Sequence, residues 1–221
     1  NAERSALLGS AAKRLASLYA RQVLDPCASA TDRQRAAVAM TDAGRQSAAA
    51  YGKGEGLPGE PGFRPYHALN RLALEAVLTK DEAAAAETID LVRYCQSAAH
   101  NAYRCNGSLW DAVMAPEAML VESLLDRRLL QEGDSGQSAF EEVARGYDES
   151  LAKLTLKPRE VDSVVAQICL LSRFCDARQV ASGAPGWQLA ADRLITLAER
   201  IAPGACRRDD RPPPCTAECA G

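Results

Sequence analysis

The spacing of apolar residues is the feature that most constrains how this chain can fold. Along almost its whole length they recur at intervals of three and four residues, which places them on one face of an α-helix. Alanine is used heavily, aromatic residues make up only 5% of the chain and runs of β-branched residues are nearly absent. Small side chains let helices approach closely, so the pattern predicts an all-α protein with close-packed helices.

The apolar spacing and the helix-breaking residues together predict eight helices. Asp25-Pro26 and Pro203-Gly204 are clear breaks. Pro65 and Pro158 suit the first turn of a helix, where a missing N–H removes no hydrogen bond. Pro116 is expected to kink the helix that contains it. The predicted helices span residues 2–24, 30–51, 65–79, 80–103, 109–131, 138–154, 158–177 and 187–201.

Two segments lack the composition of a regular element. The stretch from Gly52 to Pro65 holds five glycines and three prolines, so we expect it to be an irregular and mobile connector, or a lid or hinge. Residues 205–221 are rich in charge and proline and are expected to be disordered. The predicted organisation is therefore a helical domain over residues 1–204 followed by a tail over residues 205–221.

Short loops between successive helices predict antiparallel pairs. Eight helices make four such hairpins of roughly 35 to 50 residues, the size of a tetratricopeptide-type repeat. No consensus recurs at a fixed period, so the repeats are divergent. We expect a right-handed α-solenoid of about four hairpins, with a compact eight-helix bundle as the alternative.

The charge pattern excludes several partners. The 26 basic and 29 acidic residues are well mixed, for a net charge of -3, and no basic stripe points to a nucleic acid. No run approaches the ~20 apolar residues of a membrane span, and no secretory leader is recognisable. We therefore expect a cytoplasmic protein without nucleic-acid or membrane partners, in which a small local anion site can still form.

The chain has eight cysteines, an even number that permits disulfides. A chain of 221 residues can build a core without such staples, so buried free thiols that behave as small hydrophobes are the preferred interpretation. The cysteines are Cys27, Cys95, Cys105, Cys169 and Cys175 within the helical part, and Cys206, Cys215 and Cys219 near the C-terminal end.

Gly9 stands inside the first predicted helix, where alanine would be more stable by roughly 1 kcal/mol. A small residue at this place allows the backbone of a partner helix to approach closely. Leu8-Gly9 matches the Leu-Gly pair of a tetratricopeptide first helix, and Ala12, Leu15 and Tyr19 continue a packing face. We expect Gly9 to contact the second helix near residues 37–44.

Two further motifs extend this resemblance. LLGSAAKRLA, followed about fifty residues later by PYHALNRLALEAVL, resembles the regulatory helical region of apoptosis-signal-regulating MAP kinase kinase kinases, also called the TRAF-binding region. The matching elements are Leu8-Gly9-Ser10, Lys13-Arg14, Ala50-Tyr51, and Tyr66 with Asn70, and His67 stands where the family often has proline. The matched motifs cover about residues 7–78.

This resemblance implies a function. Bacterial relatives of the family are sensor domains in multidomain signalling and conflict proteins, where they follow a protease-like or TIR-like effector. The resemblance thus implies an excised domain with an effector on its N-terminal side. It further implies a ligand, such as a nucleotide-type signal, or a protein trigger.

We expect the recognition surface to lie on the first and third helices, because first helices of successive hairpins line the concave face of a solenoid. Lys13 and Arg14 are about 100° apart around the helix, so only one can point inward, and Lys13 is preferred. The candidate residues are Ser10, Lys13, Arg14, Arg21, Tyr66, Asn70 and Arg71.

Each of these residues also has a purely structural interpretation. Ser10, Lys13, Ser17 and Arg21 lie along one side of a helix and could form an ordinary solvated face. A buried Asn70 could cap a loop or bridge two helices rather than contact a ligand. Arg71 and Glu75 are four residues apart and are expected to form an exposed ion pair worth a few tenths of a kcal/mol.

No catalytic or metal-binding motif is recognisable. Cys95, His100 and Cys105 have poor spacing for zinc, and the glycines of GKGEG do not follow a strand as a phosphate-binding loop would. The aromatic residues Tyr94, Trp110 and Tyr147 are expected in the core or between hairpins. The resemblance therefore leaves a non-catalytic sensor or regulatory domain without cofactors as the expected function, with a plain protein-interaction scaffold as the alternative.

Overall fold

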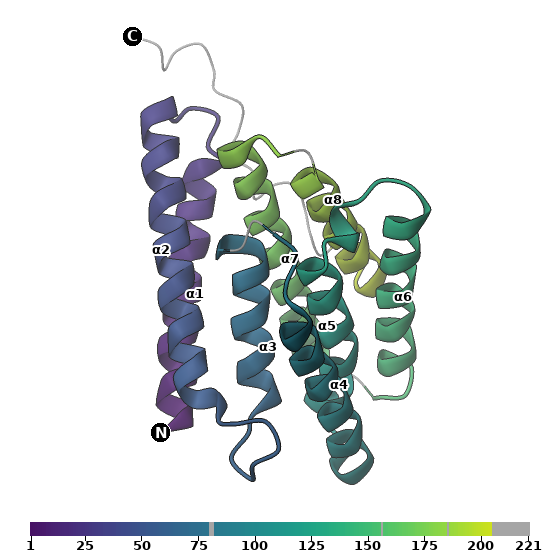
Figure 1. Ribbon diagram of the computed structural model, residues 1–221. Coiled ribbons are helices and arrows are strands. Elements are labelled where there is room, and N and C mark those ends of the chain that lie inside the picture. Colours follow the sequence, from purple (N-terminus) through teal and green to yellow (C-terminus); the bar gives the residue numbers. More distant parts are fainter. Residues whose placement is uncertain (80–81, 156, 185, 205–221) are drawn as a thin grey trace.

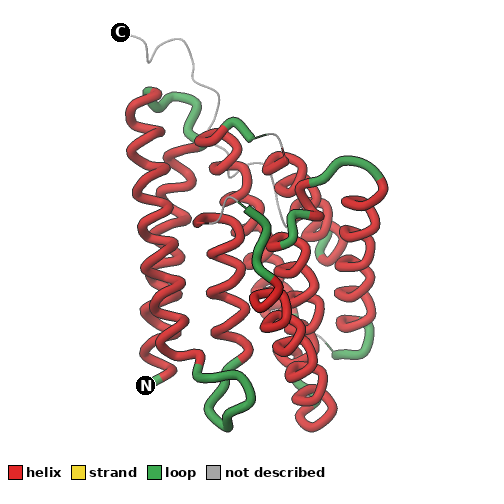
Figure 2. Tube along the Cα trace, in the orientation of Figure 1, coloured by secondary structure: helices red, strands yellow, loops and turns green. Residues whose placement is uncertain are grey.

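The computed structural model describes residues 1–79, 82–155, 157–184 and 186–204, and this part of the chain is helical without any strand (Figures 1 and 2). The all-α prediction is confirmed, as is the number of helices in this part. The helices are α1 Ala2–Val23, α2 Ala30–Glu55, α3 Pro65–Leu74, α4 Ala86–Asn106, α5 Leu109–Leu125, α6 Asp134–Leu151, α7 Pro158–Ser182 and α8 Gly186–Ile201, with a π-helical turn η1 Glu75–Thr79 and a 3₁₀ turn η2 Arg128–Leu130.

Several helix ends differ from the prediction. α4 begins at Ala86 rather than near residue 80; Lys80 and Asp81 themselves lie outside the described residues. α5 ends at Leu125 because Arg127 has a left-handed backbone with φ of 69°, which an α-helix cannot contain. α6 begins earlier than expected, and α7 ends later, at Ser182, where Gly183 with φ of 71° caps it. The predicted tail over residues 205–221 also lies outside the described residues.

The end of α2 overturns part of the prediction for the glycine-rich stretch. Residues 52–55 are helical, although we expected irregular structure from Gly52 onward. Glycine serves packing here, because a Cβ at Gly54 would lie 2.7 Å from the His67 ring and 2.9 Å from Ser5. The helix therefore gains close contact with α3 and α1 where the sequence indicated only flexibility.

The rest of that stretch, residues 56–64, forms a loop with turns. Backbone N–H groups of Glu60 and Phe63 donate to the carbonyl oxygens of Leu57 and Glu60. The loop is tied to α4, since the Gly59 N–H donates to the Tyr94 hydroxyl at 3.0 Å. Its mobility stays a prediction.

The helices pack as antiparallel neighbours, with the long α1–α2 pair at one side of the molecule (Figure 1). α3 lies in the interior, and nearly all of its residues from His67 onward are buried. α7, from the last pair, returns to pack directly on α1 and α2. The first and last hairpins therefore touch, whereas in an open solenoid each repeat contacts only its neighbours.

Gly9 makes the close helix contact that its position predicts. It is buried, and its carbonyl oxygen accepts a hydrogen bond of 2.6 Å from the Ser47 hydroxyl on α2. A Cβ here would lie 2.8 Å from the ring of Tyr51. The contact lies further along α2 than the expected residues 37–44, so the partner helix was predicted correctly and its register was not.

The cysteines divide into two groups. Cys95, Cys105 and Cys175 are free, and Cys95 and Cys175 are buried as expected. Cys27 and Cys169 are disulfide-bonded, so the prediction of free thiols is wrong for these two. None of the described helices combines the length and apolar character that crossing a bilayer requires.

Candidate functional site

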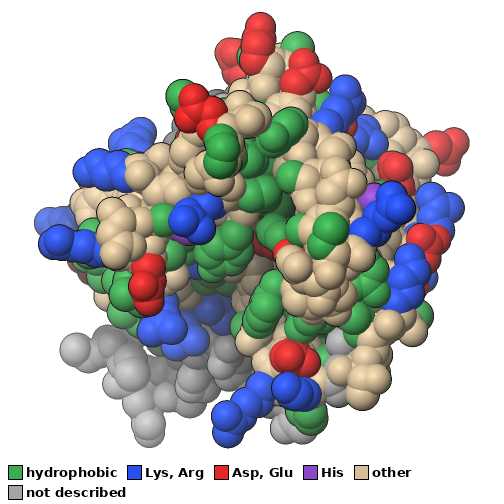
Figure 3. Space-filling view, turned by 90° about the horizontal axis from the view of Figure 1, so that it is seen from below, with side chains coloured by type: hydrophobic (Ala, Val, Ile, Leu, Met, Phe, Trp, Pro, Cys, Tyr) green, Lys and Arg blue, Asp and Glu red, His purple; other side chains and the backbone are tan. Residues whose placement is uncertain are grey.

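A cavity of about 550 Å³ lies among α3, α5, α6 and α7. Its lining comes from the first turns of α3 and α5, the early part of α7 and the last turns of α6, all at the lower end of the molecule in Figure 1. Figure 3 views this end and shows hydrophobic side chains gathered around a hollow. The lining residues are Tyr66, Asn70, Trp110, Asp111, Val113, Met114, Glu117, Tyr147, Ser163, Val164 and Gln167.

Two aromatic residues mark the more exposed part of this cavity. Tyr66 is 45% exposed and Trp110 is 52% exposed. Trp110 is therefore not in the core, which was one of the two places expected for it. Tyr147 is buried, as expected, but it also forms part of the cavity wall. Partly exposed aromatic rings beside a cavity are typical of small-molecule sites.

Glu117 is one of two acidic residues on the largely apolar wall of the cavity. It follows Pro116 within α5, and the described residues give its carboxyl group no hydrogen bond. Burial raises the pKa of Glu117, and the charge of Lys13 opposes this rise. Glu117 is half-buried, and a carboxyl group that is partly withdrawn from water without a donor is unfavourable, which marks Glu117 as a functional candidate.

Lys13 reaches the site from α1. Its Nζ donates to Asn70 Oδ1 at 2.7 Å and to Gln167 Oε1 at 3.0 Å, so it connects α1 with α3 and α7. Burial lowers the pKa of Lys13 to about 8, which Glu117 partly opposes and Arg14 reinforces. Lys13 is thus a desolvated cation just behind two residues of the cavity wall.

Ser10 and two tyrosines extend this cluster. The Ser10 and Tyr51 hydroxyls share a hydrogen bond of 3.0 Å, and Lys13 Nζ lies 5.7 Å from the Tyr51 ring centre. Burial raises the pKa of Tyr51. Burial, followed by the neighbouring Tyr51, raises the pKa of Tyr66 to about 12. Both phenols therefore stay protonated near neutral pH.

The structure brings together four of the seven candidate residues, namely Ser10, Lys13, Tyr66 and Asn70. Asn70 is buried and bridges α1 and α3, because it also donates to the Tyr66 carbonyl oxygen. The structural interpretation of Asn70 thus holds alongside its place in the cavity wall.

The other three candidates lie elsewhere. Arg14 and Arg21 are exposed on α1. Arg71 is part of an ion-pair cluster with Glu55, at 2.7 Å, and Glu75, at 3.0 Å. This cluster is not the exposed pair that we expected, because the Arg71 and Glu55 side chains are only 21% and 7% exposed.

Sequence reasoning missed Glu117, Gln167 and the role of Tyr147. Only Glu117 left a signal, as the single charged residue in the apolar segment 112–121. Gln167 and Tyr147 have no such mark, because their place in the wall depends on how α6 and α7 pack.

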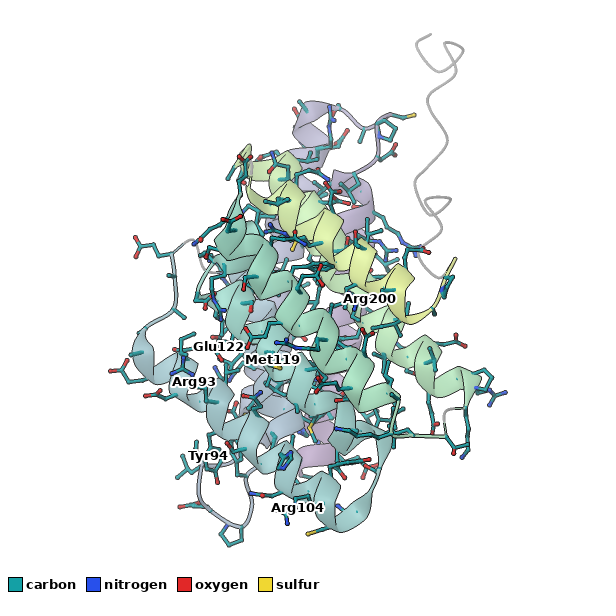
Figure 4. All side chains as sticks on the ribbon, turned by 90° about the vertical axis from the view of Figure 1, so that its right-hand side faces the viewer. Arg93, Tyr94, Arg104, Met119, Glu122 and Arg200 are labelled. Atoms are coloured by element: carbon teal, nitrogen blue, oxygen red, sulfur yellow. The ribbon has the colours of Figure 1, made fainter. Side chains whose placement is uncertain are left out.

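The described residues contain no group of three His, Cys, Asp or Glu side chains that could hold a metal ion. The outer face of α4, α5, α6 and α8 carries ion pairs instead (Figure 4). Arg93 meets Glu122 at 2.9 Å, and Arg200 meets Asp148 at 2.6 Å. Exposed pairs of this kind contribute little to stability or chemistry.

Comparison with known proteins gives no relative from which to transfer a function. The chain matches no family model, and neither the curated proteins nor the solved structures provide a match.

Proposed function

We propose that this chain is a non-catalytic regulatory domain that binds a small organic molecule in the cavity between α3, α5, α6 and α7. The observation that carries the proposal is the Glu117 carboxyl group, which lines a largely apolar cavity without a hydrogen bond from the described residues. Apolar walls with a few converging polar groups are the usual form of a ligand pocket, and about 550 Å³ suits a small organic molecule.

Binding is favoured over catalysis by the state of the polar groups. The amine of Lys13 is held by two amide oxygens rather than presented to the cavity. The Ser163 hydroxyl donates to the Arg159 carbonyl oxygen at 2.9 Å and has no base beside it. A nucleophilic mechanism needs a nucleophile paired with a base, and the described cavity residues do not provide this pair.

The regulatory role rests on the two faces of α1. Its inner face carries Lys13, which is bonded to the cavity wall, while its outer face carries Leu7, Leu8, Leu15 and Leu18. We propose that ligand binding alters the position of α1 and that α1 passes this change to an attached or associated effector. This matches the sensor role implied by the resemblance to divergent tetratricopeptide domains, with the four hairpins as curled repeats.

The ligand need not be the nucleotide-type signal implied by that resemblance. A partly buried acidic group in the cavity wall disfavours a polyanion, because like charges repel more strongly where access of water is reduced. The disulfide-bonded Cys27 and Cys169 also favour an oxidising compartment over the cytoplasm that we expected from the sequence.

A protein-interaction scaffold is the second candidate, and one observation favours it. The four leucines of the outer α1 face are between 41% and 67% exposed and lie within one stripe of the helix. Exposed apolar stripes commonly mark protein interfaces. The neighbouring Arg14 and Arg21 would favour an amphipathic partner helix with acidic flanks.

A thermal-shift screen of amino acids, nucleotides and other metabolites tests the first candidate, because a ligand of the native state raises the melting temperature. A true cavity ligand should lose most of its shift in Trp110→Ala and keep it in Val180→Ala, which removes an exposed apolar residue of α7 outside the cavity. If no compound shifts the melting temperature while Leu8→Ser with Leu15→Ser abolishes partner binding, the scaffold function is correct.

A further inference from the structure

The polar groups of the cavity point to one class of ligand. We infer that the cavity binds a zwitterion with an apolar body, of the kind represented by an α-amino acid with an aromatic or large aliphatic side chain. This inference rests on the proposed binding function and names the ligand class of the same site.

Glu117 offers an acceptor to the ligand. Its carboxyl group can only accept hydrogen bonds when ionised, and no described residue donates to it. A ligand ammonium group would satisfy it with a charge-assisted hydrogen bond, among the strongest available to a protein. The nearby Tyr147 hydroxyl also lines the cavity and has no hydrogen-bond partner among the described residues.

Gln167 offers the complementary donor to the ligand. Lys13 carries only donors, so the oxygen atoms of Asn70 and Gln167 must face its Nζ. The orientation of both side-chain amides is therefore fixed. The Asn70 amide nitrogen donates to the Tyr66 carbonyl oxygen, whereas the Gln167 amide nitrogen has no partner among the described residues and is available to the cavity. The cavity thus offers a donor, with the positive charge of Lys13 behind it, to a ligand carboxylate.

Charge balance selects a zwitterion over a simple cation or anion. Lys13 and Glu117 influence each other electrostatically, yet their charged atoms are farther apart than the 4.0 Å of a direct ion pair. Asp111, the other acidic residue of the wall, already accepts from Ser108 and Asn106. A ligand with one net charge would leave that charge unbalanced in a desolvated site, whereas a zwitterion adds none.

The apolar part of the wall determines the body of the ligand. Val113, Met114 and Val164 supply aliphatic and thioether surface, and Tyr66 and Trp110 supply aromatic faces. This surface matches an aromatic or branched side chain. A zwitterion with such a side chain fulfils the polar and apolar requirements together.

Isothermal titration calorimetry with three compounds that share a phenyl ring tests this inference on the whole chain. L-Phenylalanine carries both charged groups, 2-phenylethylamine only the ammonium group and 3-phenylpropanoate only the carboxylate. L-Phenylalanine is expected to bind at least about tenfold more tightly than either of the other two, because only it gains both charge-assisted hydrogen bonds.

Two variants test whether Glu117 and Gln167 cause the preference for L-phenylalanine. Glu117→Gln should lower the affinity for L-phenylalanine at least about tenfold and abolish its advantage over 3-phenylpropanoate, while Gln167→Met should abolish its advantage over 2-phenylethylamine. Glu122→Gln is the control, because this residue of the same helix forms an ion pair with Arg93 outside the cavity. If a variant fails to fold, the affinities of the three compounds for the unaltered protein still test the preference for a zwitterion.

Equal or tighter binding of a singly charged compound would overturn the inference, as would an absence of L-phenylalanine binding at millimolar concentration. Either result leaves the proposed function standing if the metabolite screen finds another ligand that Trp110→Ala loses. If that screen also finds none, the proposed function fails as well.

Discussion

Gly9 lies where the backbone of α1 meets the ring of Tyr51 on α2. Its carbonyl oxygen accepts from Ser47, so the two helices are held by a buried hydrogen bond at the same point. The hydroxyl of Tyr51 then reaches Ser10 and its ring lies near Lys13. The absence of a side chain at residue 9 therefore places a tyrosine that supports the candidate site.

We predict that Gly9→Ala destabilises the protein by about 1–3 kcal/mol, because its Cβ would lie 2.8 Å from the Tyr51 ring, which is packed on all sides. Urea denaturation measures the change. Gly62→Ala is the control, since nothing lies within 4 Å of the Cβ it adds. A neutral Gly9→Ala would show that Tyr51 moves aside freely and does not position the site.

Lys13 predicts a dependence of stability on pH. Its pKa is about 8 in the folded protein and 10.5 when unperturbed, so between these values the unfolded chain binds a proton that the folded chain does not. Stability from this group therefore rises as the pH increases from about 8 toward 10.5.

The unfolding free energies of the unaltered protein and of Lys13→Met are measured across this pH range. The difference between them should change by the rise that Lys13 contributes, because the variant lacks this amine. Lys53→Met, which removes an exposed lysine of α2, should keep the rise. A stability difference between the unaltered protein and Lys13→Met that stays constant over the range would mean that the Lys13 amine is solvated.

The candidate site was predictable from sequence only where its residues share a motif. Tyr66 and Asn70 are four residues apart on one helix, and Lys13 lies on the inner side of α1 beside the Leu-Gly pair. Gln167, in contrast, lies on α7, at a sequence separation of 154 residues from Lys13. No local pattern encodes such a contact, because it depends on the packing of α7 against α1.

At the scale of elements, the end of α2 shows how tertiary contacts override local composition. Glycines and prolines predicted irregular structure after Tyr51, yet α2 continues to Glu55. The Glu55 carboxylate accepts two hydrogen bonds from Arg71, at 2.7 and 2.9 Å, and these bind α2 to α3. The low helix propensity of glycine, about 1 kcal/mol per residue, is outweighed by such contacts.

We predict that Arg71→Ala destabilises the protein by about 3–5 kcal/mol, because it leaves the buried Glu55 carboxylate without its partner. Glu55→Gln combined with Arg71→Met should recover much of this loss. The comparison is Arg35→Ala, which breaks an exposed pair with Asp32 and should change stability by less than about 1 kcal/mol. Similar effects of the two single substitutions, measured by urea denaturation, would contradict the buried pair.

At the scale of the whole molecule, α7 closes the arrangement by packing on α1. Arg173 donates to the Ser17 hydroxyl at 3.1 Å, and Lys13 donates to Gln167. Helix number and antiparallel pairing follow from apolar spacing and loop length, which are local properties. The return of the last hairpin to the first is a long-range property, and the sequence left an open solenoid and a compact bundle as alternatives for this reason.

This closure predicts one cooperative unfolding transition. An open repeat array loses its hairpins separately, because each contacts only its neighbours, whereas here loss of α1 exposes α7, on which α8 packs. Trp187 on α8 is buried and reports on this far end of the chain. With Trp110→Phe to isolate the fluorescence of Trp187 and with the disulfides intact, the urea midpoint of Trp187 fluorescence should coincide with the urea midpoint of helical circular dichroism.

Gly9→Ala, at the opposite end of the chain, should lower both midpoints by the same amount. A Trp187 midpoint that stays fixed while the dichroism midpoint falls would mean that the hairpins unfold independently and that the α1–α7 contact adds little stability.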